Sequence, residues 1–137
     1  MFEYKTKGSK QLRNDFNRRK RFKKNGFRNF EDFKSWYNSQ DKVCVYCGIS
    51  EQVCQQIVLT GLLRSNRFPQ NGRVYRGKAR GMWLEVDKMV PIEKYSRNNC
   101  VLACYFCNND KSDVFNYEQY KMFRENRYSY LKNLICE

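Results

Sequence analysis

Two pairs of cysteines have the spacing in this sequence that points most directly to chemistry. They are Cys44-x-x-Cys47 and Cys104-x-x-Cys107. Each CxxC turn presents two thiolates on one side, and two such turns complete the tetrahedral all-sulfur set that structural zinc prefers. The alternative, four unconnected core thiols, would require four buried cysteines to reach this arrangement by chance. The sequence therefore predicts one structural Zn²⁺ ion bound by all four cysteines.

The chain contains no histidine. This absence excludes a histidine general base, Ser–His and Cys–His catalytic pairs, and mixed Cys/His zinc sites. The other cysteines lack a partner at metal-binding spacing: Cys100 is expected to pack in an apolar strand, and Cys54 and Cys136 are left unassigned. Whatever reaction the chain performs, its general base is not an imidazole.

Charge and composition narrow the class of partner. The 137 residues carry a formal net charge of +13, with a pI near 9.6. A field of this size indicates a polyanion, either a nucleic acid or an anionic membrane surface. No stretch approaches the roughly 18 apolar residues of a transmembrane helix, and the start of the chain lacks the apolar run of a secretory signal. With aromatic residues at 16%, we expect one small, folded, cytoplasmic protein with reduced cysteines.

Basic residues gather in two stretches. Residues 1–30 hold eleven Lys or Arg against Glu3 and Asp15, and we interpret them as a basic arm that contacts phosphates, ahead of a domain over residues 31–137. The second stretch is an expected insertion over residues 55–82, in which Asn71-Gly72 predicts a hairpin turn. The alternatives are a solvated face or a frayed terminus for the first stretch and an ordinary exposed hairpin for the second. The predicted nucleic-acid contacts are Arg18, Arg19, Lys20, Arg21, Arg73, Arg76, Lys78 and Arg80.

Helices are expected on both sides of the cysteine pairs. Asn29 is a candidate cap for a short helix, because an apolar stripe assigned to core packing follows it at Phe30, Phe33, Trp36 and Tyr37. A second helix is expected after Asn116, which stands three residues before Gln119 as in a capping box. Residues 55–63 fit a helix or a strand, and periodicity does not decide between them.

The segment from Leu84 to Asp113 resembles the signature of HNH, or ββα-metal, endonucleases. It begins as a strand over residues 83–91 and continues through a second short strand and the second cysteine pair into a helix. In that family an Asp-His strand is followed by an Asn five residues before a CxxC pair, then by Asn or His after the last Cys, and then by a Lys. The matching positions are Asp87, Asn99, Asn108 and Lys111. The resemblance covers about residues 40–115 and implies an α+β fold, a small zinc-stabilised ββα-metal core with flanking helices and a basic N-terminal arm.

The sequence departs from the family pattern at the histidine that activates water. Lys88 stands there, and a protonated lysine is a poor general base unless it is strongly desolvated. The block from Val86 to Ser96 resembles, however, the PacI-like branch of restriction endonucleases, which has Arg at this position and a Tyr seven residues later. Tyr95 stands at that spacing after Lys88. In that branch the tyrosine is thought to initiate strand cleavage.

The resemblance implies roles for these side chains around a hard divalent cation, Mg²⁺ or Mn²⁺. Asp87 and Asn108 would supply oxygen ligands, and the cation would stabilise the phosphorane and the leaving 3′-oxygen. Tyr95 would deprotonate water or itself attack phosphorus, with Lys88 as an electrostatic clamp on the phosphate. Asn99 would brace the loop between strand and helix by hydrogen bonds. Simpler roles stay open for four of these residues. Asp87 could cap a strand end and Asn108 could cap a helix. Tyr95 could simply pack, and Lys88 could be a solvated charge.

We therefore expect a site-specific endonuclease acting on double-stranded DNA, bacterial or phage-encoded, in the manner of a type II restriction enzyme. A homing-type phage nickase is one alternative. The missing histidine favours another, a non-catalytic zinc-stabilised DNA-binding module, and RNA binding or cleavage fits the charge equally well. A homodimer is also expected, since two-fold symmetry on a palindrome would cut both strands.

Overall fold

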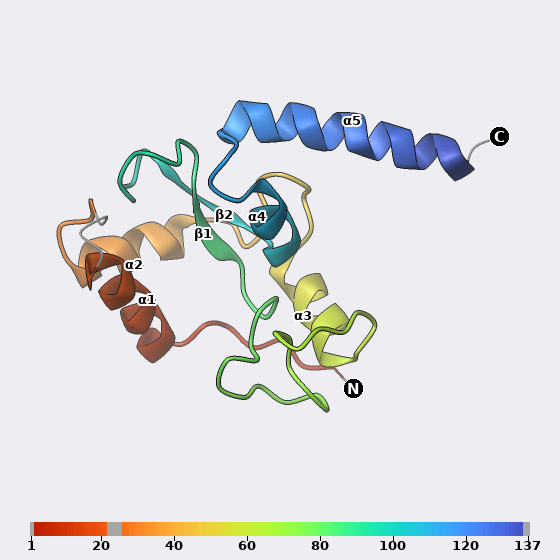
Figure 1. Cartoon of the computed structure of the whole chain (residues 1–137). Helices are drawn as coiled ribbons and strands as arrows, with labels where there is room; N and C mark the ends of the chain where they lie inside the picture. Colours follow the sequence, from red (N-terminus) through yellow and green to blue (C-terminus); the bar gives the residue numbers. More distant parts are fainter. Residues whose placement is uncertain (1, 22–25, 136–137) are drawn as a thin grey trace.

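The computed structural model describes residues 2–21 and 26–135, with the side chains of residues 19–21 and 127–135 outside the description. In chain order the elements (Figure 1) are α1 (Ser9–Arg21), α2 (Phe30–Ser39), α3 (Glu51–Leu59), β1 (Glu85–Lys88), β2 (Cys100–Ala103), α4 (Tyr105–Lys111) and α5 (Tyr117–Ile135). Over the described residues the chain combines helices with one two-stranded sheet. This arrangement confirms the predicted α+β class.

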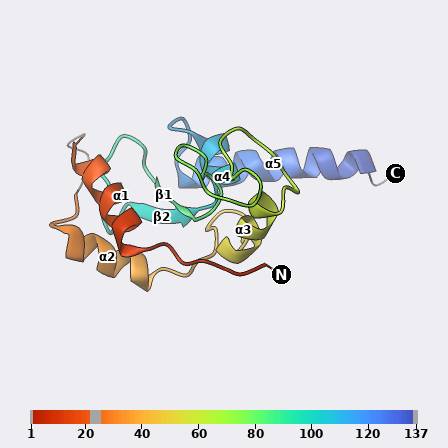
Figure 2. The same ribbon diagram turned by 90° about the horizontal axis from the view of Figure 1, so that it is seen from below.

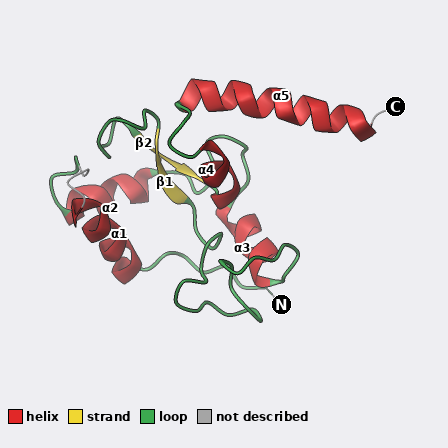
Figure 3. Ribbon diagram, viewed as in Figure 1, coloured by secondary structure: helices red, strands yellow, loops and turns green. Residues whose placement is uncertain are grey.

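The hairpin of β1 and β2, together with α4, forms the centre of the fold. The strands are antiparallel, with Asp87 opposite Val101, and α4 packs against β1. The side chains of Glu85 and Asp87 both bond to residues of α4, as the expected alternation along this strand requires. Figure 3 shows that loops occupy the long interval between α3 and β1. The central unit is therefore short and depends on its surroundings for support.

An aromatic core joins α1 and α2, which lie side by side (Figure 1). Asn29 caps α2 as predicted, since its Oδ1 accepts the N–H of Asp32 at 2.9 Å. Phe16 and Phe27 pack on Phe33, with ring centroids 5.9 and 5.2 Å apart. The predicted stripe is fully buried: Phe30, Phe33, Trp36 and Tyr37.

The amino-terminal segment contributes to this core as well as to the charge. Leu12 and Phe16 of α1 are buried in the main hydrophobic cluster. Ahead of α1, Gln55 of α3 accepts the N–H of Lys5 at 2.9 Å and donates to its carbonyl at 2.7 Å. Figure 2 shows this segment running from α1 toward α3. The stretch expected to be a basic arm therefore contacts α3 at Lys5 and packs into the main hydrophobic cluster along α1.

Residues 51–59 form α3, which includes residues 55–59 of the stretch that the sequence left open between helix and strand. Ser50 caps this helix, because its Oγ accepts the N–H of Val53 at 3.1 Å. A side-chain cap of this kind satisfies a backbone donor that would otherwise lack a partner, which favours the helix.

The predicted turn at Asn71-Gly72 is confirmed. Gln70 and Arg73 exchange backbone hydrogen bonds of 2.9 and 3.0 Å, and both turn residues have positive φ. Between residues 60 and 84, all of them described, strand pairing is limited to isolated bridges. Residues 60–82 of the basic insertion thus form a folded loop rather than an extended hairpin, and residues 55–59 belong to α3.

α5 begins at the predicted capping box. Asn116 Oδ1 accepts the N–H of Gln119 at 2.8 Å, and Gln119 Oε1 accepts the N–H of Asn116 at 3.0 Å. Tyr120 fixes the first turns, since it is buried and its hydroxyl donates to Asp110 at 3.0 Å. The later turns extend beyond the core (Figure 1). No described helix is long and apolar enough to cross a membrane.

Replacing Phe33 by alanine should destabilise the protein strongly. Phe33 is 0% exposed, and loss of a buried phenylalanine costs about 3–5 kcal/mol because it leaves a cavity. Urea denaturation should show this fall in the free energy of unfolding. Leu62→Ala is the control, since Leu62 is 71% exposed and should change stability little. Equal effects of the two substitutions would contradict the packing described.

Candidate metal centre and active site

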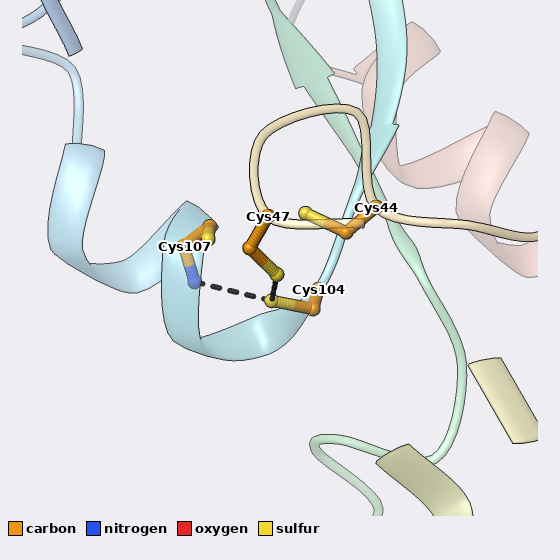
Figure 4. Close-up of side chains that lie close together, drawn as sticks. All are labelled: Cys44, Cys47, Cys104 and Cys107. Atoms are coloured by element: carbon orange, nitrogen blue, oxygen red, sulfur yellow. Dashed lines mark hydrogen bonds between the residues drawn. The ribbon is translucent and has the colours of Figure 1, made fainter. Parts of the chain in front are cut away.

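Four cysteine sulfur atoms gather where the turn at residues 44–47 meets the β2–α4 junction (Figure 4). All four lie within 4.8 Å of one another, and the Sγ atoms of Cys47 and Cys104 are 3.9 Å apart. A tetrahedral ion with metal–sulfur bonds near 2.3 Å holds its sulfurs about 3.8 Å apart. The cluster therefore fits a metal ion, and the four cysteines of the predicted site do lie together; zinc as the bound ion stays a prediction.

Backbone hydrogen bonds form both cysteine turns. In the first turn the Gly48 N–H bonds to the Cys44 carbonyl at 2.9 Å, and Gly48 has a φ of +80°, which glycine adopts without a Cβ penalty. In the second, Cys104 caps α4, since its Sγ accepts the N–H of Cys107 at 3.4 Å. A further backbone hydrogen bond joins the first turn to β2. The two pairs are thus brought together by contacts of the chain itself.

Asp87 of β1 is buried, with 6% of its surface exposed. The Tyr46 hydroxyl donates to its Oδ2 at 2.6 Å, and the Lys111 ammonium lies 3.2 Å from Oδ2 and 3.3 Å from Oδ1. Burial raises the pKa of the Asp87 carboxyl, and the contacts with Tyr46 and Lys111 offset part of that rise. Breaking one side of such a buried ion pair typically costs about 3–5 kcal/mol. Asp87 therefore ties β1 to α4 and to the first cysteine turn.

Glu85 lies two residues earlier on the same face of β1 and has different partners. Its Oε1 accepts the Nδ2 of Asn108 at 2.8 Å. Arg80 donates to both Glu85 oxygens, at 2.8 and 3.0 Å, while its guanidinium lies 4.7 Å from the centre of the Tyr105 ring. The hydrogen bonds from Arg80 to Glu85 raise the pKa of Arg80. Glu85 is thus the β1 carboxylate that hydrogen-bonds to Asn108, the residue whose amide is predicted to bind a metal.

A cavity of about 720 Å³ opens between α1 and the loop that leads into β1. Glu85 and Asn108 line it from the ββα core, and Tyr95 lines it from the loop between the strands. Asp87 is not among its lining residues. Four cationic side chains also line the cavity, Lys7, Arg18, Arg76 and Arg80, together with Asp15, which pairs with Lys7 and Arg18. An anion such as a phosphate suits this lining better than a cation alone would.

Tyr95 is placed by Lys88 and by the segment before α2. The Lys88 ammonium lies 4.9 Å from the centre of the Tyr95 ring and donates to the Pro91 carbonyl at 2.6 Å. The Tyr95 carbonyl accepts the N–H of Gly26. A Cβ atom at Gly26 would lie 2.7 Å from that carbonyl oxygen, so the approach requires glycine. Sequence reasoning assigned Gly26 no role.

Asn99 braces the loop that carries Tyr95. Its Oδ1 accepts the N–H of Val90 at 2.9 Å, and its Nδ2 donates to the carbonyls of Val90 and Lys94 at 3.1 Å each. The expected hydrogen bonds are therefore present. The braced loop joins two strands rather than a strand and a helix, because β2 intervenes before α4.

The predicted nucleic-acid contacts fall into three groups. Arg18, Arg76 and Arg80 line the cavity. Arg73 is exposed on the loop between α3 and β1, where the Lys78 ammonium bonds to the Asn66 carbonyl at 2.9 Å. The remaining side chains lie outside the described residues: Arg19, Lys20 and Arg21.

The structure does not join the two predicted ligands of a catalytic cation. Both Asp87 oxygens are engaged inside the core, whereas Asn108 reaches the cavity beside Glu85. As placed, Asp87 does not fit a cation held in the cavity, and its pairing with Asn108 stays a prediction. Sequence reasoning overlooked Glu85, although strand alternation puts it on the same face as Asp87.

No protein-family model matches the chain, and no curated protein does. Among solved structures, the chain is similar to the rare-cutting HNH restriction endonuclease PacI, an enzyme that exhibits an extraordinary mechanism of DNA perturbation. The likeness covers 86% of this chain and 79% of PacI, at 25% sequence identity and a TM-score of 0.60. The two proteins share an HNH-like core, and this finding supports the predicted fold.

Cys44→Ser should lower the metal content of the purified protein and destabilise it. The serine oxygen is a poorer zinc ligand than a thiolate, and the tetrahedral set would lose one member. Elemental analysis by mass spectrometry, with zinc expected, measures the change. Cys100→Ala is the matched control, because Cys100 is buried but does not belong to the cluster. Undiminished metal in Cys44→Ser would remove Cys44 from the site.

Proposed function

We propose that this chain is a DNA endonuclease of the HNH kind, which hydrolyses phosphodiester bonds with the help of a divalent metal ion. The observation that supports this most is a cavity lined by Tyr95, Asn108 and several Lys and Arg side chains, in a fold similar to that of PacI. The net charge of +13 is consistent with a polyanionic substrate. The specific form we propose is a type II restriction enzyme that cuts double-stranded DNA as a homodimer.

The cavity suits a phosphodiester group. Arg76 would bind phosphate oxygens through charge-assisted hydrogen bonds. Tyr95, after losing its phenol proton to solvent, would either take a proton from the attacking water or itself attack phosphorus to form a phosphotyrosine ester that water then hydrolyses. In both cases the bond from phosphorus to the 3′-oxygen breaks, and that oxygen takes up a proton from solvent. Lys88, 4.9 Å from the ring, would stabilise the negative charge that develops there. A bound Mg²⁺ or Mn²⁺ would supply Lewis-acid stabilisation of the leaving oxygen.

Binding without cleavage is the second candidate function. The pairing of Asp87 with Lys111 and the absence of histidine favour a zinc-stabilised DNA-binding module, in which the cavity holds a phosphate and no reaction follows.

If the protein does cleave DNA, cutting of one strand would favour the homing-type alternative. A double-strand break within a palindrome would favour restriction.

Tyr95→Phe should abolish most cleavage of plasmid DNA. Loss of a general base or nucleophile typically lowers the rate by at least about 100-fold, and the phenylalanine ring preserves packing. Gel electrophoresis of nicked and linear products measures the rate. Tyr117→Phe is the control, because Tyr117 packs near Tyr46 and does not line the cavity. Unchanged cleavage by Tyr95→Phe would refute its catalytic role.

Arg76→Ala should weaken duplex DNA binding in a salt-dependent way. If Arg76 contacts one phosphate, the slope of log affinity against log salt should fall by about 0.9. Fluorescence anisotropy at several salt concentrations gives this slope. Arg124→Ala on α5 removes the same charge outside the cavity lining and should leave the slope unchanged. Identical slopes for wild type and Arg76→Ala would exclude that contact.

A further inference from the structure

We infer that α1 reads DNA sequence: Asn14 and Gln11 contact base edges in the major groove, beside a phosphate bound by Arg76, and Asn14 selects adenine. The inference rests on the proposed function and adds to it the residues that set the sequence preference. The amino-terminal stretch was predicted to contact phosphates, whereas this face of α1 carries amides as well as charges.

One face of α1 lines the cavity and another face is buried in the core. Gln11, Asn14 and Arg18 line the cavity, and their spacing of three and four residues places them along one side of the helix. Leu12 and Phe16, four residues apart, are buried in the main hydrophobic cluster. This buried pair fixes the rotation of α1 about its own axis, so that the two amides stay at the cavity.

The chain ahead of α1 is also held in place. The Gln55 side chain bonds to the N–H and the carbonyl of Lys5 at 2.9 and 2.7 Å, and the Trp83 indole donates to the same carbonyl at 2.9 Å. At the start of the helix, Gln11 Oε1 accepts the N–H of Gly8 at 2.6 Å. Reading a base requires a side chain held in one position, whereas phosphate contacts carry no sequence information. The anchoring of α1 therefore suits a helix that reads bases.

The amides of α1 match a base edge better than a phosphate. A phosphate offers only acceptor oxygens, whereas a carboxamide has both a donor and an acceptor. In the major groove adenine presents N7 as an acceptor and its N6 amino group as a donor, which pair with the two groups of asparagine. Asn14 is exposed at the cavity, so both of its groups can reach a base. Gln11 keeps its Nε2 donor for a base acceptor while its oxygen bonds to Gly8.

The charges around the cavity assign the phosphate to the other wall. Lys7 and Arg18 pair with Asp15, so the cations on the α1 side are partly neutralised. Arg76 is exposed and lines the cavity from the loop between α3 and β1. A phosphate is therefore bound best beside Arg76, which leaves the amides of α1 to the neighbouring bases.

Selection of bound duplexes from a random pool tests the inference without relying on cleavage. The zinc-loaded full-length protein is mixed with short random DNA duplexes in buffer without Mg²⁺ or Mn²⁺, and the bound duplexes are sequenced. Wild type should prefer adenine at one fixed position, and Asn14→Ala should lower that discrimination by about 5- to 150-fold, the range for one bidentate base contact. Asn17→Ala is the matched control, because Asn17 is exposed on the same helix and does not line the cavity.

Two further measurements test the second amide and the groove. Gln11→Glu keeps an oxygen for the Gly8 N–H and loses the amide donor, so it should relax the preference at a neighbouring position. Replacing the preferred adenine by 7-deazaadenine removes the N7 acceptor of the major groove. This replacement should weaken binding to wild type and leave binding to Asn14→Ala unchanged.

The outcomes separate base reading from the proposed function. An unchanged preference in a folded Asn14→Ala protein overturns base reading, as does an equal loss in Asn17→Ala; circular dichroism establishes folding. Equal wild-type affinity for adenine and 7-deazaadenine duplexes overturns the major-groove contact, and an unchanged preference in Gln11→Glu overturns the role of Gln11. If Asn14→Ala keeps the preference and wild type cuts plasmid DNA with Mg²⁺, the inference fails and the function stands. If Asn14→Ala loses the preference but wild type never cuts DNA, base reading stands and the nuclease function fails.

Discussion

The cluster of four thiols joins the turn at residues 44–47 to the β2–α4 junction, and the rest of the site depends on that junction. Tyr46 lies between the first two cysteines and reaches Asp87, while Asn108 directly follows the last cysteine and reaches Glu85. A metal ion bound by these thiols would contribute directly to folding, because a core of this size buries limited apolar surface. Loss of the ion would loosen the contacts to both carboxylates of β1.

Those two carboxylates show how one strand face serves two purposes. Asp87 is enclosed by a tyrosine and a buried lysine, so its charge is neutralised inside the protein. Glu85, at the start of β1, meets a half-exposed arginine beside a cavity that also contains Tyr95. Burial decides the difference, since a paired charge deep in the core resists separation more than one at the surface. The Asp87 pair is thereby a fixed part of the core, whereas the Glu85 pair lies at the cavity.

Features set by local chemistry were predictable from the sequence. The CxxC spacing identified the thiol cluster, and caps and turn residues identified the starts of α2 and α5 and the bend at Asn71-Gly72. Features set by contacts between distant residues were not. Tyr46 and Asp87 are 41 positions apart, and no periodicity links them. The path of the loop before β1 likewise follows from tertiary contacts, such as the pairing of Arg80 with Glu85.

The most direct test of the proposed function is incubation of the zinc-loaded, unmodified protein with supercoiled plasmid DNA and Mg²⁺. We expect nicked or linear products whose formation stops when EDTA removes the Mg²⁺. Sequencing of the product ends would then show whether the cuts share one site. Stable duplex binding with intact plasmid at every ratio of protein to DNA would contradict nuclease activity and leave a zinc-folded DNA-binding protein.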